Sequence, residues 1–194
     1  IPSSANGTTV SLRPLADGVY SIGIAQSRNF TWSPKGKSGE LQSWNANNLY
    51  EDSTVGNEPL FYVKYAGNGY YTIYNLQYEQ YVSIDAASGT NAASTGAVDV
   101  DDRLKLVSLT EAEAQANDTT LWLIERNNGI SPNSNQNAYT IRPKLAPKYG
   151  VDLDAGGLTN GVKLHLWDVA SSTNCGWNFN AHANGDGNMT GFED

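Results

Sequence analysis

Apolar and polar residues alternate along short stretches of this chain, with the period of two that is typical of half-buried β-strands. The clearest succession of such stretches lies between residues 139 and 180. Gly156, Gly157, Asn160 and Gly161 separate two of these stretches with residues that tolerate positive φ in turns. The pattern predicts four short strands, at 139–141, 149–153, 162–167 and 177–179.

The opening of this unit recurs twice earlier in the chain, as internal repeats do in modular folds. The three openings are Tyr20-Ser-Ile22, Tyr71-Thr-Ile73 and Tyr139-Thr-Ile141. Another aromatic residue stands ten positions beyond each tyrosine, namely Phe30, Tyr81 and Tyr149. Each unit closes with an aromatic residue in an alternating stretch, namely Phe61, Trp122 and Trp177. We expect the opening tyrosines and the closing aromatic residues to form a repeated layer of the core.

Three units therefore cover most of the chain, at about residues 17–67, 68–136 and 137–182. Residues 1–16 are expected to form a flexible lead-in whose last part pairs as an edge, and residues 183–194 a polar tail. Three pseudo-repeats of four short strands are the arrangement of a β-trefoil, so the sequence predicts a single all-β domain with this fold. The second unit is the longest, and Thr110 and Glu113 form a capping box that predicts a short surface helix between its strands.

The third unit resembles one subdomain of a ricin-B-like β-trefoil lectin. The resemblance rests on an early Asp152, the pair Asn160-Gly161, an aromatic Trp167 and the loop residue Asn174 ahead of Trp177. Two positions depart from the family pattern, because Cys175 replaces its Gln before the last Trp and His165 stands where Gln is frequent. The resemblance implies a non-catalytic carbohydrate-binding module, accessory to a larger secreted glycan-handling protein.

The same resemblance assigns roles to four residues of this unit. Trp167 would stack on the apolar face of a sugar, Asp152 would accept hydrogen bonds from two neighbouring hydroxyls, Asn174 would both donate and accept, and His165 would add an auxiliary contact. A core position is the alternative for Trp167. The alternation favours exposure, because it places Leu164 and Leu166 on one face of the strand and His165 and Trp167 on the other.

The first unit repeats part of this pattern, and the second lacks it. Leu41-Gln42-Ser43-Trp44 aligns with the strand that ends at Trp167, so Gln42 and Trp44 are candidates for a second sugar site. Ser33 takes the place of Asp152 there, which removes the charged acceptor. In the second unit Asp85 lies near the corresponding position, but residues 98–101 hold no aromatic residue in the place of Trp167, so we expect no binding.

Charge and composition exclude several other classes of partner. The net charge of −8 argues against nucleic acid, whose phosphates are bound by clustered Lys and Arg. No apolar run approaches the roughly 20 residues of a membrane span, and no charged-then-apolar leader precedes Ile1, so we expect any signal segment to have been removed. Many Trp, Tyr and Asn residues suggest a secreted or cell-surface protein. Cys175, the single cysteine, is expected to be buried beside Trp177.

Catalysis is not expected. Asp152 with Asp154, and Asp101 with Asp102, are carboxylate pairs of the kind that glycoside hydrolases use, but no apolar surrounding is evident to raise the pKa of an acid. His165 and His182 lack partners at metal-ligand spacing, and no cofactor motif is present.

Two alternatives to this interpretation remain open. Residues 182–193 resemble the start of a calcium-binding loop, with His182 in place of the first Asp, although a frayed tail is favoured. A protein-interaction or protease-inhibitor β-trefoil is the alternative function.

Overall fold

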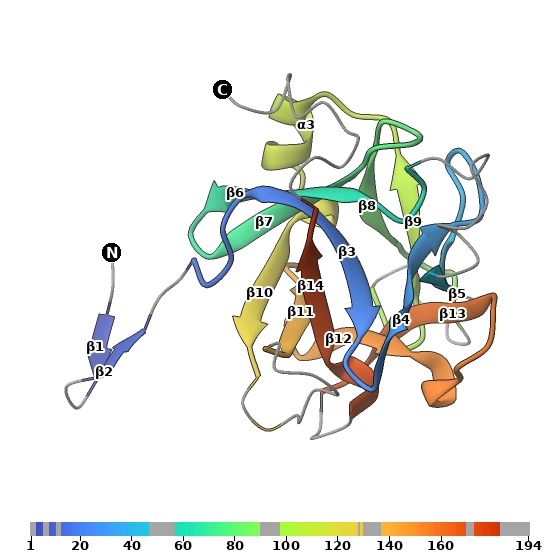
Figure 1. Cartoon of the computed structure of the whole chain (residues 1–194). Helices are drawn as coiled ribbons and strands as arrows, with labels where there is room; N and C mark the ends of the chain where they lie inside the picture. The colour runs from blue at the N-terminus through green and yellow to red at the C-terminus, as the bar shows by residue number, and fades with distance from the viewer. Residues whose placement is uncertain are drawn as a thin grey trace.

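The computed structural model describes residues 3–5, 8–10, 13–46, 57–89, 98–127, 129, 137–169 and 173–182. Within these residues the chain is built almost entirely of antiparallel strands (Figure 1). The first unit contains β3 (Gly18–Ile24), β4 (Ser27–Pro34), β5 (Leu41–Asn45) and β6 (Phe61–Gly67). The second contains β7 (Tyr70–Asn75), β8 (Gln80–Asp85), β9 (Arg103–Val107) and β10 (Trp122–Arg126). The third contains β11 (Tyr139–Pro143), β12 (Tyr149–Leu153), β13 (Val162–Asp168) and β14 (Trp177–Ala181).

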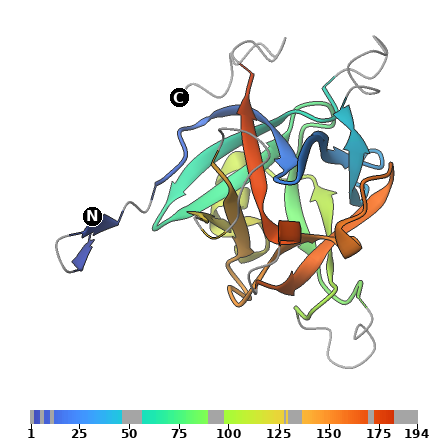
Figure 2. The same cartoon turned by 60° about the horizontal axis from the view of Figure 1, so that its bottom comes forward.

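The first and last strands of the three units close into a barrel. Their antiparallel pairings run β3–β6, β6–β7, β7–β10, β10–β11, β11–β14 and back from β14 to β3. The middle strands of each unit form the hairpins β4–β5, β8–β9 and β12–β13, and β13 also pairs with β5 and β9. Figure 2 brings forward the bottom of the view in Figure 1, where the orange β12 and β13 lie. The predicted all-β β-trefoil of three four-stranded units is confirmed.

Aromatic residues from equivalent positions of the three units fill the centre of the barrel. The opening tyrosines and closing aromatic residues are all buried, as the repeats predicted. Trp32 packs edge to face against Phe61 and Trp177, with ring centroids 6.1 Å and 5.5 Å apart. The indole Nε1 of Trp122 donates to the Val82 carbonyl at 3.1 Å, and that of Trp177 donates to the Val151 carbonyl at 2.8 Å. These two hydrogen bonds identify Val82 and Val151 as equivalent positions of the second and third units.

The predicted surface helix is also present. Helix α3 (Glu111–Ala116) begins after Thr110, whose side chain accepts a hydrogen bond from the Glu113 N–H. It lies at the top of the molecule in Figure 1, on the other side from β12. Three short 3-10 helices, η1 (Asp118–Thr120), η2 (Asp154–Gly156) and η3 (Thr173–Cys175), occupy connections in the described part of the chain.

The lead-in contains a small hairpin of its own. Strands β1 (Ser3–Ala5) and β2 (Thr8–Val10) pair with each other and stand apart from the barrel in Figure 1. Leu15, which the sequence interpretation placed in the lead-in, is buried in the main core, and its backbone exchanges hydrogen bonds with the Tyr71 hydroxyl. The chain therefore joins the packed body shortly before β3.

Strand register corrects the alignment of the second unit. Because Val82 and Val151 are equivalent, the residue that matches Asp152 is Ser83, not Asp85. Ser83 lies opposite Lys105 on β9, as Asp152 lies opposite His165 on β13. The place of Trp167 is then taken by Val107, so the prediction that residues 98–101 occupy it was wrong. The connection from β8 to β9 is longer than that from β12 to β13, so counting residues along the chain does not align the two units.

Candidate functional site

A pocket of about 420 Å³ opens beside the β12–β13 hairpin of the third unit. Its lining comes from the end of β12, the turn η2, strand β13 and the turn η3. The lining residues are Asp152, Asp154, Ala155, His165, Trp167, Asp168 and Asn174. The four candidate residues of the third unit, which come from β12, β13 and η3, therefore meet in one concavity.

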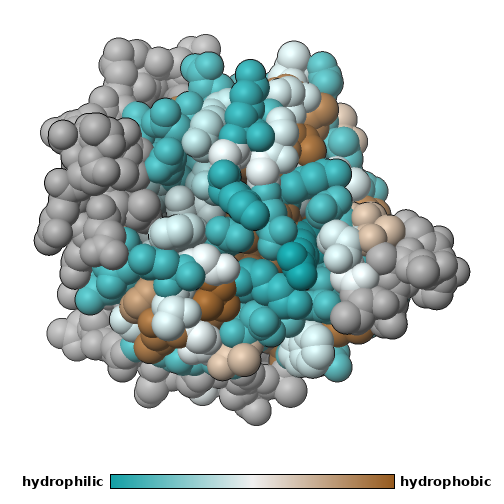
Figure 3. Space-filling model, turned by 90° about the vertical axis from the view of Figure 1, so that its right-hand side faces the viewer, coloured by the Kyte–Doolittle hydropathy of each residue, from teal (hydrophilic) through white to brown (hydrophobic). Residues whose placement is uncertain are grey.

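Trp167 presents its ring at the surface of this pocket. Its side chain is exposed (46%), whereas Leu164 and Leu166 on either side of His165 are fully buried. The indole stacks on the His165 ring, with centroids 5.2 Å apart and planes at 22°. The face of the molecule that carries β5, β9 and β13 is otherwise mostly hydrophilic, with small apolar patches (Figure 3). Among the described residues, Trp167 is the only aromatic of the three exposed large hydrophobic residues, the others being Leu145 and Leu158.

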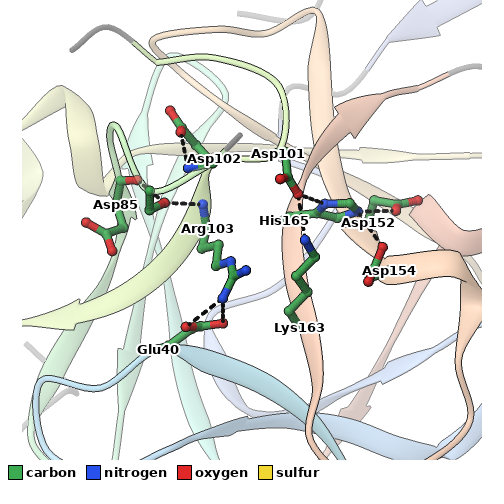
Figure 4. A network of polar contacts seen from close by, with 11 residues as sticks. Glu40, Asp85, Asp101, Asp102, Arg103, Asp152, Asp154, Lys163 and His165 are labelled. Carbon is green, nitrogen blue, oxygen red and sulfur yellow. Dashed lines mark hydrogen bonds and ion pairs between the residues drawn. The ribbon is translucent and has the colours of Figure 1, made fainter. Parts of the chain in front are cut away.

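His165 does not lie where the sequence interpretation placed it. We expected an exposed auxiliary contact beside Trp167, but the structure buries His165 (3% exposed) beneath that indole. Its Nδ1 lies 2.6 Å from Oδ1 of Asp101, and its Nε2 lies 2.7 Å from Oδ2 of Asp152 (Figure 4). Two carboxylates compensate the loss of water, so a polar ring is stable at a buried strand position. Because each ring nitrogen contacts a carboxylate, neither one is available to contact a sugar in this arrangement.

Asp152 is the least exposed of the three carboxylates that line the pocket. It is 5% exposed, and each carboxylate oxygen already has one partner in the protein. Oδ2 faces His165, and Oδ1 accepts a hydrogen bond from the Cys175 thiol at 3.2 Å. Burial, followed by the charge of Asp152, raises the pKa of the Cys175 thiol, which therefore stays a neutral donor. Since each carboxylate oxygen has a second lone pair, Asp152 keeps acceptor capacity toward the pocket.

Asn174 is held against the opposite wall of the pocket. The side-chain amide of Gln26, from the β3–β4 turn, donates to Oδ1 of Asn174 at 2.5 Å. Gly156 adopts φ of +65° beside it, and a Cβ at that position would lie 2.6 Å from the same oxygen. Glycine adopts this left-handed backbone without strain, and a side chain here would displace the Asn174 amide. The glycine turn seen in the sequence thus positions a polar side chain of the site.

Gln42 and Trp44 do not join this pocket, and their own surroundings differ from it. Both are partly buried on β5, and Nε1 of Trp44 donates to Oε1 of Gln42 at 3.1 Å. Ser33, opposite Gln42 on β4, is buried (3% exposed). The first unit therefore pairs an aromatic residue with an amide but offers no carboxylate at the position of Asp152.

The structure adds residues that sequence reasoning did not assign to the site. Asp154, Ala155 and Asp168 complete the lining, and Asp101 reaches His165 from the connection between β8 and β9. Asp154 lies in η2, beyond the end of the strand that carries Asp152. Asp168 directly follows Trp167 and could have been proposed from that neighbourhood. Asp101 is 64 positions from His165, so no pattern of neighbouring residues predicts their contact.

The described residues show neither a metal-binding cluster nor a membrane-spanning helix. No group of three or more His, Cys, Asp or Glu side chains is arranged to hold a metal ion in the described part of the chain. The calcium loop suggested for residues 182–193 falls almost wholly on residues 183–194, which lie outside the described residues. Among the residues that the structure describes, no helix has the length and apolar character needed to cross a membrane.

Comparison with known proteins identifies the fold. No family model matches the sequence, and no curated protein matches it either. Among solved structures, the designed three-fold symmetric protein ThreeFoil is similar at a TM-score of 0.63 with 12% identity, over 86% of this chain and all of that one. The Macrolepiota procera ricin B-like lectin, solved with lactose, gives a TM-score of 0.61 with 18% identity, over 87% of this chain and 99% of that one.

A third similar structure is part of a larger enzyme. The exo-β-1,3-galactanase of Clostridium thermocellum gives a TM-score of 0.62 with 14% identity, over 92% of this chain but only 33% of that one. The chain thus has the β-trefoil fold of the ricin-B-like lectins, a fold that occurs both alone and as one part of longer chains.

Proposed function

We propose that this protein binds carbohydrate without catalysis, through the third-unit pocket. One observation carries the proposal: an exposed Trp167 borders a concavity that also contains a buried carboxylate, Asp152, and an oriented amide, Asn174. A sugar ring presents an apolar C–H face and a rim of hydroxyls, which match an aromatic face and a few fixed polar groups. The lactose complex of the similar fungal lectin supports this class of ligand.

The first unit is proposed as a weaker site at most. Trp44 and Gln42 supply an aromatic face and an amide, and the indole N–H donates to the amide oxygen. Hydrogen bonds to a charged acceptor contribute about 1.5–3 kcal/mol, roughly twice those between neutral groups. Without a carboxylate in the place of Asp152, this unit lacks its strongest sugar contact.

The weak affinity expected of a single sugar site favours an accessory role. A single open site of this kind gives dissociation constants on the order of 0.1–10 mM, because few contacts offset the ordering of ligand and side chains. Such a module is useful when attached to a partner that acts on the same glycan. We therefore propose an accessory role in a secreted or cell-surface glycan-handling protein, as the trefoil within the longer galactanase chain illustrates.

A glycan array with the intact protein, followed by NMR titration of the best ligand, tests this function. We expect Trp167→Ala to weaken binding by at least about tenfold, equal to about 1.4 kcal/mol, because it removes the stacking surface. Leu145→Ala is the matched control, since Leu145 is equally exposed (45%) but does not line the pocket. Binding that survives Trp167→Ala but not Trp44→Ala would move the site to the first unit. Absence of any bound glycan would favour a protein-interaction or inhibitor role.

A further inference from the structure

His165 is enclosed by carboxylates on both of its ring nitrogens. Asp101 and Asp152 approach Nδ1 and Nε2 at 2.6 Å and 2.7 Å, and all three residues are at most 5% exposed. A neutral imidazole carries one N–H, so its second nitrogen would direct a lone pair at a carboxylate oxygen. An imidazolium donates from both nitrogens. The geometry therefore matches the charged form of His165.

The other charged groups near His165 are either acidic or paired with a carboxylate. Oδ1 of Asp154, on η2, lies 3.9 Å from Nε2 of His165. Lys163, two residues earlier on β13, donates to the same Asp101 oxygen at 2.9 Å. Arg103 lies opposite His165 on β9, but its guanidinium is directed to Glu40 (Figure 4).

Among the described residues, the carboxylates of Asp101, Asp152 and Asp154 lie near the ring, and the Lys163 ammonium is paired with Asp101. Burial would lower the pKa of His165, but its hydrogen bonds to Asp152 and Asp101 outweigh burial and raise that pKa. The carboxylates that surround the ring therefore favour its protonated form.

Asp101 is placed beside His165 by backbone hydrogen bonds between the second and third units. The Asp101 N–H donates to the Leu166 carbonyl at 2.7 Å, and the Leu166 N–H donates to the Asp102 carbonyl at 2.8 Å. Asp101 itself adopts the left-handed region, with φ of +70°. Asp102 accepts from the backbone N–H groups of Gly89 and Asp99, which fixes the connection. Asp101 is therefore held beside His165 by rigid backbone contacts.

We propose that Asp101, contributed by the second unit, is a positioning residue of the third-unit sugar site. It keeps His165 as an imidazolium, whose Nε2–H holds the Asp152 carboxylate in the orientation that receives sugar hydroxyls under the edge of Trp167. This inference rests on the proposed sugar binding. It also makes binding depend on pH. The Asp152 carboxylate is held in place while His165 is protonated. As the pH rises through the pKa of His165, one ring nitrogen loses its proton and directs a lone pair at a carboxylate, so this restraint is lost.

NMR of the ring nitrogens of His165 tests the first step without any ligand. In the unaltered protein we expect both nitrogens to be protonated at pH 6.5, with a titration midpoint above that of an ordinary histidine. Asp101→Asn should lower that midpoint by at least about one unit, since it removes one of two neighbouring negative charges. A neutral, singly protonated His165 at pH 6.5 in the unaltered protein would overturn the proposal.

Sugar affinity measured from pH 5.5 to 8.5 tests the second step. Asp101→Asn should weaken binding at pH 7.5 by at least about tenfold and at pH 5.5 much less, whereas Asp118→Asn, another acidic residue of the second unit, should leave the profile unchanged. His165→Gln supplies a neutral amide donor to Asp152 and should make binding independent of pH over this range. Identical profiles for the unaltered protein and Asp101→Asn would refute the role of Asp101. Absence of any bound sugar would instead count against the proposed function, while the nitrogen signals would still report on Asp101.

Discussion

At the scale of single residues, the molecule shows how a polar side chain gains a buried position. His165 occupies a strand position that faces away from Leu164 and Leu166, yet it is covered by the Trp167 indole. The carboxylates of Asp101 and Asp152 satisfy both ring nitrogens, so burial leaves none of its hydrogen-bonding groups unmet. The same contacts tie Asp152 in place at the floor of the pocket. His165, expected from the sequence to contact sugar, instead pairs with the carboxylate that is proposed to do so.

The stability of the protein in acid should report on Asp101. Burial would raise the pKa of this carboxyl, but hydrogen bonds from His165 and Lys163 lower it to about 2. Because the folded pKa lies below the unfolded value of 3.8, the stabilisation is complete above pH 4 and is lost as the pH falls through about 2. Its size is about 2 kcal/mol. In urea titrations, Asp101→Asn should be less stable than the unaltered protein by about this amount at pH 5, with the gap closing toward pH 2.

Asp118→Asn provides the comparison for that measurement. Asp118 pairs with Lys144 at 2.8 Å, but its side chain is half exposed, and such surface pairs contribute less than about 1 kcal/mol. A gap for Asp101→Asn that stays constant down to pH 2 would show that the carboxylate charge of Asp101 does not contribute to stability.

At the scale of elements, the three units share a framework but differ in how well their polar groups are paired. Trp122 and Trp177 occupy equivalent strands, β10 and β14, and both donate to a carbonyl of the neighbouring hairpin. Trp32, on β4, is equally buried, but its Nε1 has no hydrogen-bond partner. Thr31 Oγ1 and Ser43 Oγ, from the same hairpin, are also unpaired. The first unit therefore contains polar groups whose burial is not compensated.

This difference predicts an unequal cost for the same substitution. Trp177→Phe removes a buried hydrogen bond in addition to apolar area, and we expect it to lower the free energy of unfolding by about 3 kcal/mol or more. Trp32→Phe loses similar area but also eliminates an unpaired donor, whose burial costs about 1–3 kcal/mol. Its effect should be smaller by at least about 1 kcal/mol. Guanidinium unfolding monitored by circular dichroism measures both, and equal losses would contradict the expectation.

At the scale of the whole molecule, charge limits which sugars can be bound. The chain carries a net charge of −8, and the pocket lining includes Asp152, Asp154 and Asp168. Like charges about 4 Å apart near a protein surface repel by about 4 kcal/mol, more than the roughly 1.4 kcal/mol that a tenfold loss of affinity requires. The proposed site should therefore accept neutral or amino sugars and discriminate against uronic and sialic acids.

Titration with a neutral ligand and its uronic acid counterpart checks this expectation. The acid should bind at least about tenfold more weakly at low salt, and the difference should shrink in about 0.5 M salt because the charges are screened. Asp154→Asn should narrow the difference, since the Asp154 side chain is half exposed at the pocket wall. Asp118→Asn, far along the chain and absent from the lining, should not. Equal binding of the two sugars by the unaltered protein would contradict the argument.

The sequence by itself determined the architecture. Alternating apolar residues and the three recurrences of Tyr-x-Ile specified the strands, the units and the aromatic core, because side chains on a strand point to opposite faces with a fixed period. The resemblance of the third unit to a ricin-B-like subdomain, together with the alternation that favours an exposed Trp167, indicated the candidate site in the third unit. These features are local, so a one-dimensional pattern can carry them.

Only the tertiary structure decided how that pocket is organised. The side chains of Asp101 and His165 come from two units, and backbone hydrogen bonds between Leu166 and residues 101 and 102 bring them together. The alignment of the second unit required the observed pairing of β8 with β9. Burial of His165 is made possible by carboxylates from two segments of the chain that are distant in sequence, at Asp101 and at Asp152. Long-range packing and electrostatic compensation depend on distances in space, and the spacing of residues along the chain does not encode them directly.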